Sequence, residues 1–532
     1  MTRTTLTSLL AGTCLCTLAV VTLAEAATVT LETEDGSVRI NGELLNFDGT
    51  SYEVETAIGT VSVMKDMVSC VGEACPSLAP EQSEFAIAGS KALAANLIPE
   101  LVKGYGGAQQ GKILRTSAVG RNAETLNVLD SKVGRADVTL TSTNSRDGIG
   151  ALLNGNADLA LATRPARSRE LRDFQAKNLG DLRSPEQEHI VAIDALLLVT
   201  HPQNPVRAVT EAGAALAFSG GIENWAQLGG ADAPINLYVR DADSGTREVF
   251  DNLLMRPNAA SVATNVTVLG SDAEVAAAVL RDPNGLGFTS YAQAGDARAL
   301  DIEGVCGLRT PANALTIKTE EYPLTRLLYM YQTNGELPWH AQDFLTFVNS
   351  PAGQTVVAKA GFVDQSITSE TINSQGIRVA SAVVNNSSPS DYRQMQEMFS
   401  LLLSADRLST TFRFETGSAR LDARAQADIG RLATLLQTEQ FANKEVIFVG
   451  FTDSVGKNDL NRILSEQRAE LVRRSVLGAN PELRDQLKTR AVGFGEISPL
   501  GCNETGQGRR INRRVEVWVQ DIVADNRLAA TN

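Results

Sequence analysis

The stretch from Gly450 to Ala469 most constrains the fold of this chain, because it joins the end of an apolar strand to a loop and then a helix. The loop contains glycines and one carboxylate, Asp453. In the helical pattern that follows, three polar residues stand four and then three positions apart, which places them on one helix face. These residues are Asn461, Ser465 and Arg468. The segment predicts a strand–loop–helix unit with a polar site between its loop and its helix.

A loop Asp that faces a helix Arg suits a ligand carrying an ammonium and a carboxylate on one carbon. Asp453 can accept hydrogen bonds from the ammonium, and the guanidinium of Arg468 can bind the carboxylate through two parallel bonds. The plainer alternative is that Asp453 caps the following turn and that Arg468 pairs with a neighbouring Glu. Three further motifs in the same region favour the binding site.

These motifs are FETGSARL (Phe414 to Leu421), GFGEISP (Gly493 to Pro499) and GRRINRRVEV (Gly508 to Val517). With them, the region resembles the peptidoglycan-associating domain shared by OmpA-like and Pal-like proteins. The resemblance implies an α/β domain over 405–522 in which Asp453 and Arg468 clasp the diaminopimelate of the peptide stem. Asn461 is expected to join this site. Phe451 departs from the family, which commonly has His there.

The N-terminus has the pattern of a secretory signal over 1–26, with a basic start, an apolar run and a small-residue cleavage site. A retained anchor is disfavoured because the run is short and contains Thr and Gly. A lipoprotein signal ending at Cys14 is disfavoured by Thr13. We therefore expect a periplasmic protein associated with peptidoglycan or the outer membrane, and 532 residues predict several domains.

The formal net charge of −14 argues against nucleic acid as a partner, so any anion site must act locally against the field of the whole chain. Four cysteines remain after the signal. Cys70 and Cys75 stand in a short turn-rich stretch, and an exported setting favours a disulfide between them. Half of a metal site is the alternative, but no His cluster lies nearby. Whether Cys306 and Cys502 pair stays open.

The patterning divides the chain into four parts. Residues 27–80 alternate apolar and polar positions between Asp-Gly and Asn-Gly turns, which predicts a small antiparallel β module. Residues 83–365 alternate short strands with helical segments, which is typical of an α/β sheet with crossover helices. A linker with one helix is expected over 366–404, before the C-terminal domain.

The middle segment contains a candidate anion cradle where a strand ends at Arg240 and a helix opens at Ser244-Gly245-Thr246. Free amides at the helix start, two hydroxyls and a guanidinium would suit an anion, and Gly245 would let the backbone approach closely. For these residues alone, the plainer alternative is that Ser244 is only a helix N-cap. Other strand ends carry similar residues, namely Gly89, Ser90, Ser145 and Thr163.

With these elements in order, the region resembles the PstS-like phosphate-binding proteins of ABC importers. The resemblance implies two α/β lobes with a hinge that close on phosphate or a similar oxyanion. It places Gly89, Ser90, Ser145, Thr163, Arg240, Ser244, Gly245 and Thr246 at the ligand. Two positions depart from the family: the first loop lacks a hydroxyl near Ala92, where Lys91 can supply charge instead, and the expected acidic residue falls at Ala242, between Asp241 and Asp243.

Other sequence patterns give little indication of function. Gly106 to Lys112 approaches a nucleotide P-loop but lacks the hydroxyl that binds magnesium. The basic pairs Arg509-Arg510 and Arg513-Arg514 are interpreted as a solvated domain surface. No nucleophile elbow or metal-spaced His pair occurs, so we expect no enzyme activity, no metal and no cofactor.

The hypothesis from sequence is an exported protein that binds phosphate or a similar oxyanion and is anchored non-covalently to peptidoglycan. An ABC permease is the partner that this reading implies. The alternative is an envelope structural or sensing protein whose middle domain has altered or lost its ligand.

Overall fold

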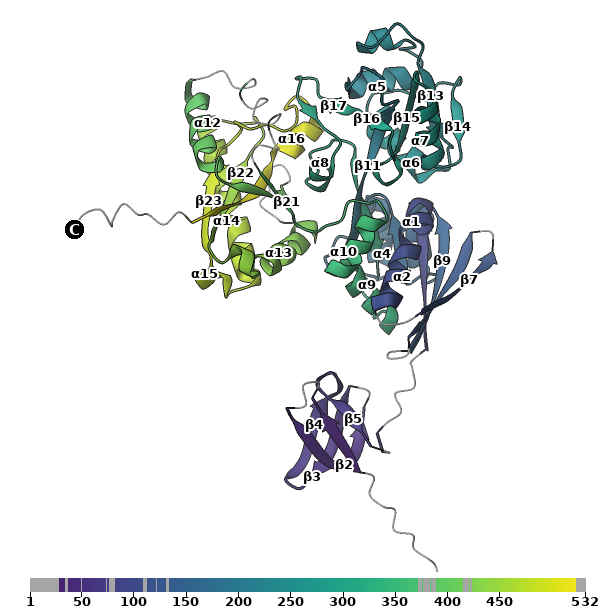
Figure 1. The fold of residues 1–532 in the computed structure, drawn as a ribbon, viewed down its shortest axis with the longest axis vertical. Coiled ribbons are helices and arrows are strands. Elements are labelled where there is room, and N and C mark those ends of the chain that lie inside the picture. The colour runs from purple at the N-terminus through teal and green to yellow at the C-terminus, as the bar shows by residue number, and fades with distance from the viewer. Residues whose placement is uncertain are drawn as a thin grey trace, which may run out of the picture. The chain divides into compact units, whose positions relative to one another are not determined.

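The computed structural model in Figure 1 describes residues 28–522, with gaps at 34–36, 49, 73, 76–81, 109–111, 121, 131–133, 372–375, 377–382, 384–388, 415–420 and 422. The expected signal at 1–26 and most of the FETGSARL motif lie outside the described residues. The chain divides into two compact units, Met1–Ala79 and Pro80–Asn532. No helix among the described residues is both long and apolar enough to cross a membrane.

The first unit is a five-stranded antiparallel sheet in the order β4-β3-β2-β1-β5. One face carries a small core of Val29, Leu31, Tyr52 and Val54, as the period-2 alternation predicts. The Cys70–Cys75 disulfide favoured from the sequence is present at its end. The strands are β1 (Thr28–Glu32), β2 (Arg39–Phe47), β3 (Ser51–Thr56), β4 (Gly59–Met64) and β5 (Ser69–Val71).

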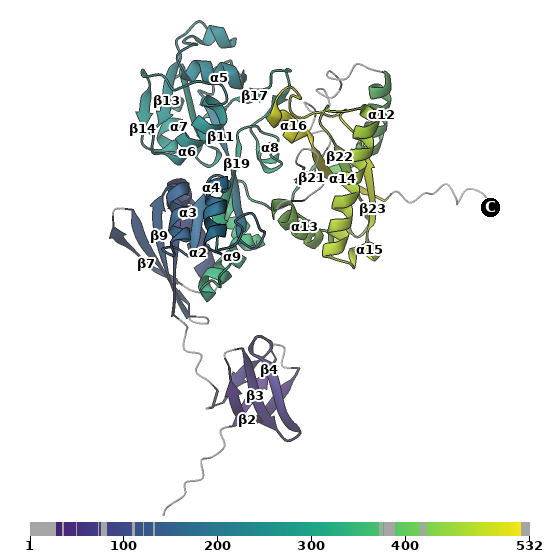
Figure 2. The same cartoon turned by 180° about the vertical axis from the view of Figure 1, so that it is seen from behind.

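The second unit begins with an α/β lobe, lobe 1, whose sheet is covered by helices on both faces, as the two views show (Figures 1 and 2). Its strands run in the order β19-β10-β6-β9-β8-β7. Helices α1, α2, α9 and α10 pack on one face, and α3 and α4 pack on the other. The strands are β6 (Gln82–Ser90), β7 (Lys112–Gly120), β8 (Ala123–Asp130), β9 (Gly134–Thr143), β10 (Leu159–Ala162) and β19 (Thr325–Tyr331). The helices are α1 (Lys91–Asn96), α2 (Ile98–Ala108), α3 (Ser145–Leu153), α4 (Ser168–Ala176), α9 (Trp339–Asn349) and α10 (Pro351–Lys359).

Lobe 2 continues the same sheet through β11, β15, β13 and β14 around a separate core that contains Trp225, Phe250 and Phe288. A small sheet of β12, β17 and β18 adjoins it. Its main elements are β12 (Ala208–Thr210), α5 (Glu211–Phe218), β13 (Asn236–Arg240), α6 (Gly245–Phe250), the π-helical turn η3 (Asp251–Met255), β14 (Thr267–Leu269), α7 (Asp272–Arg281), β15 (Gly285–Ser290), β16 (Arg298–Ala299), β17 (Asp301–Glu303), β18 (Arg309–Thr310) and α8 (Ala314–Lys318).

One long strand, β11 (Glu188–Thr200), joins the two lobes. Its first part pairs with β19 and its second part pairs with β15. At the changeover, the carboxylate of Asp194 accepts hydrogen bonds from Arg326 and from the Tyr291 amide, and both charged side chains are buried. This ion pair fixes the crossing point between the lobes.

The C-terminal domain is a mixed sheet in the order β20-β21-β24-β22-β23. Alternate residues of β22 face opposite sides: Val446 and Phe448 pack with α13 and α14, whereas Ile447 and Val449 pack with α12. The elements are β20 (Ser369–Thr371), α12 (Pro389–Leu402), β21 (Asp406–Arg413), α13 (Ala423–Leu436), β22 (Lys444–Phe451), α14 (Asn458–Ala479), α15 (Leu483–Gln486), β23 (Lys488–Gly493), α16 (Gly506–Asn512) and β24 (Arg514–Asp521). The fold class predicted from sequence is confirmed in all three parts.

Candidate functional site

A cavity of about 390 Å³ lies between the two lobes, where α1, α3 and α6 begin. Backbone amides at a helix start carry partial positive charge and bind anions. The residues that line the cavity include Ser90, Lys91, Ser145, Arg146, Ser244 and Gly245.

Ser90 is buried, and its hydroxyl has no hydrogen-bond partner among the described residues. A buried hydroxyl without a partner is costly, so a group that binds in the cavity would satisfy it. Gly245 faces Ser90, because a Cβ there would lie 3.7 Å from the Ser90 Oγ. Gly89 has a φ of 142°, and a Cβ there would lie 2.2 Å from the Leu161 carbonyl oxygen. Only glycine fits at position 89.

The structure brings Ser145 and Thr163 together. The Thr163 amide donates to the Ser145 Oγ over 3.1 Å, and the two hydroxyl oxygens are 3.3 Å apart. Thr163 is not part of the cavity lining. The Ser244 Oγ accepts a bond from the Arg247 amide over 3.4 Å. Ser244 is therefore a helix N-cap and also lines the cavity, so the two alternatives predicted from the sequence, N-cap and anion-site residue, are compatible.

Arg240 and Thr246 are absent from the cavity lining and bind a neighbouring carboxylate instead. The guanidinium of Arg240 pairs with Asp272 and Asp241 and donates to the carbonyl of Gly270 over 2.9 Å. The Thr246 hydroxyl donates to Asp272 over 2.8 Å. In this conformation, the cationic side chains that reach the cavity are Lys91 and Arg146.

The loop between β13 and α6 contributes acidic groups near the cavity. Asp241 pairs with Arg240, whereas Asp243 and Ala242 line the cavity. Glu248 of α6 also lines it and pairs with Arg167 of lobe 1 over 3.3 Å, so one ion pair joins the two lobes at the cavity edge. Both side chains of that pair are partly exposed, at 43% and 34%.

In the C-terminal domain, Asp453 is buried and its Oδ2 lies 2.7 Å from the Nη1 of Arg513. Its Oδ1 accepts a bond from the Val455 amide over 3.2 Å. Asn461 donates to the Asp453 carbonyl over 3.3 Å and to the carboxylate of Glu496 over 2.6 Å. The predicted loop and helix residues do come together here.

Arg468 is 1% exposed and lies over the ring of Phe414, with 5.0 Å between its Cζ and the ring centroid. Burial lowers the pKa of this guanidinium, the charge of Arg513 lowers it further, and Asp453 opposes both effects. Two guanidiniums therefore lie near the Asp453 carboxylate, and Asn461 joins the Glu496 carboxylate to the same site. A guanidinium here can bind the carboxylate of a ligand through two parallel bonds.

Arg513 is the residue that sequence reasoning missed. The interpretation of the basic pair Arg513-Arg514 as a solvated surface is wrong, because the two residues are 7% and 0% exposed. Arg514 is the first residue of β24, the central strand of the sheet, and it pairs with Glu516 of the same strand over 2.6 Å. The apolar alternation that follows, Val515-Glu-Val-Trp-Val519, was the signal for a buried strand.

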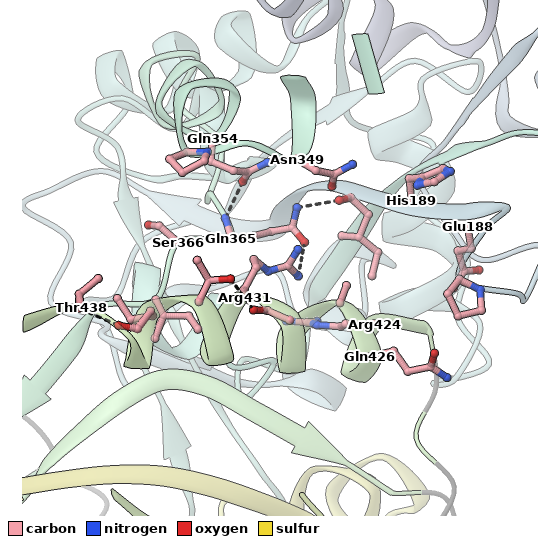
Figure 3. Close-up of a pocket in the computed structure, with 18 residues that line it drawn as sticks. Glu188, His189, Asn349, Gln354, Gln365, Ser366, Arg424, Gln426, Arg431 and Thr438 are labelled. Carbon is pink, nitrogen blue, oxygen red and sulfur yellow. Dashed lines mark hydrogen bonds between the residues drawn. The ribbon is translucent and has the colours of Figure 1, made fainter. Parts of the chain in front are cut away.

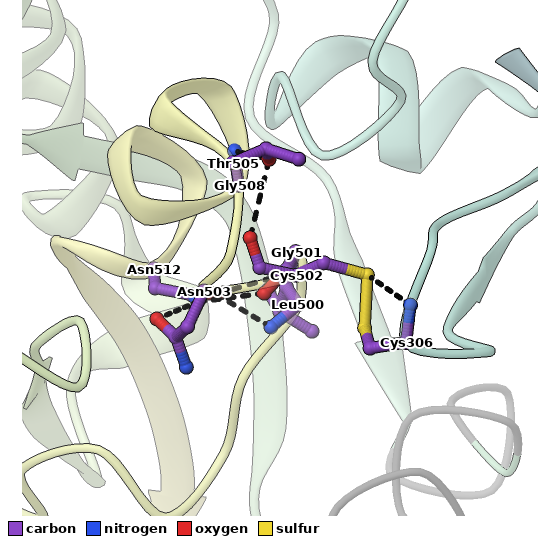
Figure 4. The surroundings of a disulfide bond; sticks show 8 residues. All are labelled: Cys306, Leu500, Gly501, Cys502, Asn503, Thr505, Gly508 and Asn512. Atoms are coloured by element: carbon purple, nitrogen blue, oxygen red, sulfur yellow. Dashed lines mark hydrogen bonds between the residues drawn. A yellow bond between two sulfur atoms is a disulfide. The ribbon is translucent and has the colours of Figure 1, made fainter. Parts of the chain in front are cut away.

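A disulfide between Cys306 of lobe 2 and Cys502 joins the middle domain to the C-terminal domain (Figure 4). Asn503, the next residue, accepts a bond from the Ser454 amide over 3.2 Å. Ser454 follows Asp453 directly. The covalent joint therefore lies beside the loop that carries the candidate clasp.

Ion pairs reinforce this joint. Glu320 of the middle domain pairs with Arg424 over 2.5 Å and with Arg510 over 3.4 Å, and Arg413 lies 4.0 Å away. Burial acts to raise the pKa of Glu320, but the three guanidiniums outweigh it and lower the pKa to about 2. Glu321 pairs with Arg407 in the same interface.

A larger cavity of about 820 Å³ lies between lobe 1 and helix α13, and Figure 3 shows Gln365 and Arg431 within it. Gln365 accepts a bond from Arg431 over 3.0 Å and donates to the Ile190 carbonyl. None of the predicted site residues lines this cavity.

Comparison with known proteins gives two family matches: the PBP superfamily domain over residues 118–352 and the OmpA family over residues 413–513. A phosphate-binding protein PstS of Borreliella burgdorferi is 28% identical over 233 residues, which cover 42% of this chain and 79% of that protein. Outer membrane porin F of Pseudomonas aeruginosa is 35% identical over 114 residues, which cover 21% of this chain and 31% of the porin.

A solved structure of an ABC-type phosphate transport receptor from Vibrio cholerae matches 52% of this chain and 99% of its own, with 21% identity and a TM-score of 0.40. The family matches confirm both resemblances. Residues 118–352 match the PBP superfamily domain and are similar to PstS, and residues 413–513 match the OmpA family.

Proposed function

We propose that this protein binds phosphate or a similar oxyanion in the cavity between its lobes and is held non-covalently to peptidoglycan by its OmpA domain. The observation that carries the first half is the buried hydroxyl of Ser90, which finds no hydrogen-bond partner in the described part of the chain and faces a cavity where three helices begin. The similarity to phosphate-binding proteins adds the ligand class.

The lining of the cavity supports an oxyanion over a neutral ligand. Ser90, Ser145 and Ser244 supply short hydroxyls, and Gly245 leaves its amide open to close approach. Lys91 and Arg146 supply positive charge, and Asp147, Asp243 and Glu248 belong to the same lining, so the hydroxyl and amide donors carry the argument for an oxyanion. Charged and amide donors that converge on one small cavity are what an oxyanion with several acceptor oxygens requires.

Calorimetry of the mature chain with phosphate and with sulfate tests this half. We expect heat with phosphate, and loss of that heat in the double variant Ser90→Ala/Ser145→Ala. Ser219→Ala is the matched control, because its hydroxyl bonds to the Leu216 carbonyl on an exposed turn of lobe 2. Absence of heat with both anions would contradict oxyanion binding.

The second half rests on the cluster of Asp453, Arg468 and Arg513 beside Asn461. We propose that a diaminopimelate residue of the peptide stem binds here, with its ammonium on Asp453 and its carboxylate on a guanidinium. Co-sedimentation with purified sacculi tests it. Arg468→Ala is expected to leave the protein in the supernatant, whereas Asp485→Asn on the exposed surface of α15 is expected to sediment like the wild type.

The alternative function, an envelope structural or sensing protein with an altered middle domain, has one specific observation in its favour. Arg240 is bound to Asp272 and Asp241 instead of lining the cavity. Binding to sacculi without heat from phosphate or sulfate would favour this alternative. We further propose that the protein is exported and that an ABC permease is its partner.

A further inference from the structure

A group of four arginines lies outside both proposed sites. Arg164, Arg167, Arg183 and Arg256 line a shallow hollow of about 590 Å³, together with Asn252 and the backbone around Pro165. We call this hollow the outer arginine groove. No acidic residue belongs to its lining.

Neighbouring carboxylates neutralise only part of this charge. Arg164 pairs with Glu170 through two bonds of 2.8 and 2.9 Å, and Arg167 pairs with Glu248. Burial acts to raise the pKa of Glu170, but the bonds from Arg164 and from the Arg167 amide outweigh it and lower the pKa, so this carboxylate stays charged. Among the described residues, Arg183 and Arg256 have no carboxylate partner.

The groove spans both lobes. Arg164, Arg167 and Arg183 flank helix α4 of lobe 1, whereas Arg256 directly follows η3 of lobe 2. A second hollow of about 290 Å³ shares Pro165, Ala166 and Arg183 with it and reaches Arg424 and Arg510 of the C-terminal domain. Glu188, Glu320 and Asp428 also line this second hollow, and Glu320 and Asp428 pair with its arginines, so the excess of positive charge is confined to the outer arginine groove.

We propose that the outer arginine groove is a second anion site, separate from the cavity at Ser90, and that it binds an extended phosphate anion of the oligophosphate class. Guanidinium forks match the paired oxygens of phosphate groups. A single orthophosphate is small beside a hollow of about 590 Å³ that draws arginines from two lobes. A linear anion with several phosphates contacts guanidiniums on both sides at once.

Because the whole chain is negatively charged, the local excess of arginines favours multiply charged anions over singly charged ones. A net charge of −14 repels anions at long range, so a single isolated cation on the surface attracts anions only weakly. A multiply charged anion gains from each guanidinium that it contacts, and this gain shrinks as salt screens the exposed charges. Binding in the groove is therefore expected to weaken more steeply with salt than binding in the Ser90 cavity.

Calorimetry of the mature chain with tripolyphosphate tests the proposal. The double variant Arg183→Ala/Arg256→Ala is expected to bind tripolyphosphate about tenfold or more weakly, since bonds to charged groups are strong. The matched control is Arg169→Ala/Arg281→Ala, which removes one exposed arginine from each lobe outside the groove. Equal tripolyphosphate affinity in the groove variant and the wild type would overturn the proposal.

Two further binding measurements distinguish the outer arginine groove from the inner cavity and test its ligand class. Tripolyphosphate binding is expected to persist in Ser90→Ala/Ser145→Ala, which removes hydroxyls from the inner cavity only. Loss of tripolyphosphate binding in that variant would place the ligand in the inner cavity and overturn a separate site. Citrate is the test of ligand class: citrate binding as tight as that of tripolyphosphate would overturn the assignment to oligophosphate.

Discussion

Asp453 and Arg513 form a buried ion pair at the centre of the C-terminal site, with 2.7 Å between the Oδ2 and the Nη1. Burial and the charge of Arg513 lower the pKa of Arg468, so two guanidiniums lie near the Asp453 carboxylate, and Asn461 joins the Glu496 carboxylate to the same site. The pair gives the buried Asp453 carboxylate a cationic partner inside the domain. It also places the predicted clasp partner, Arg468, where its guanidinium can serve a ligand.

Removing Arg513 is expected to cost stability as well as binding. Arg513→Ala leaves the Asp453 carboxylate buried without its cation, and breaking such a pair costs about 3 kcal/mol of unfolding free energy. Thermal denaturation checks this loss. Arg513→Lys keeps the charge and is expected to recover part of the stability. Equal melting of Arg513→Ala and wild type would contradict the role given to this pair.

The ion pair between Arg167 and Glu248 leads to a prediction about affinity. Glu248→Gln removes a negative charge from the edge of the cavity, so we expect phosphate binding to tighten by about threefold. Stability should change by less than about 1 kcal/mol because the pair is partly exposed. Glu223→Gln, an exposed position of lobe 2, is the control. Weaker phosphate binding in Glu248→Gln, without a change in Glu223→Gln, would contradict this reading.

The Cys306–Cys502 disulfide should hold the two domains together beyond what the ion pairs achieve. Its cysteines are 196 positions apart, and removing a native disulfide typically costs about 2–5 kcal/mol. Cys306→Ser/Cys502→Ser is therefore expected to lower the melting temperature of the second unit. Limited proteolysis should cut faster between residues 366 and 404. Cys70→Ser/Cys75→Ser, confined to the first unit, should leave that cleavage rate unchanged, and faster cleavage there would contradict the assignment.

Glu320 gives the joint a defined dependence on pH. Its pKa in the folded protein is about 2, below the ordinary value of 4.5. Its stabilising effect is therefore fully present above pH 4.5 and is lost as the pH falls towards 2. The melting temperature of Glu320→Gln should lie below that of the wild type at pH 7, and the gap should close in this window. A gap that stays constant down to pH 2 would contradict the charge-based joint.

Sequence patterns predicted the architecture well where each element carries its own signal. The turn predicted at Asp48 does join β2 to β3, and the motifs of the C-terminal domain predict its α/β fold. The turn predicted at Asn41-Gly42 is wrong, because both residues lie inside β2 and pair with Thr30 and Val29 of β1. Ser90, Ser145 and Ser244 stand at the ends of strands or the starts of helices. Polar residues at such positions of one sheet gather at the same edge, which is why all three line one cavity.

Side-chain direction and long-range pairing could not be predicted from the sequence, because they depend on partners that lie far away along the chain. The guanidinium of Arg240 is directed by Asp272, a partner 32 positions away, and local spacing contains no sign of it. The burial of Arg513 depends on strand β24 lying between β21 and β22. The same holds for Cys306 and Cys502, whose pairing requires the packing of two separate domains.

The most direct test of the account is to sediment sacculi with radiolabelled phosphate and the mature protein. We predict that phosphate enters the pellet with the wild type. With Ser90→Ala/Ser145→Ala the protein should sediment without phosphate, and with Arg468→Ala both should remain in the supernatant while phosphate still binds the protein. Wild-type protein that sediments with sacculi but brings no phosphate with it would contradict the central claim.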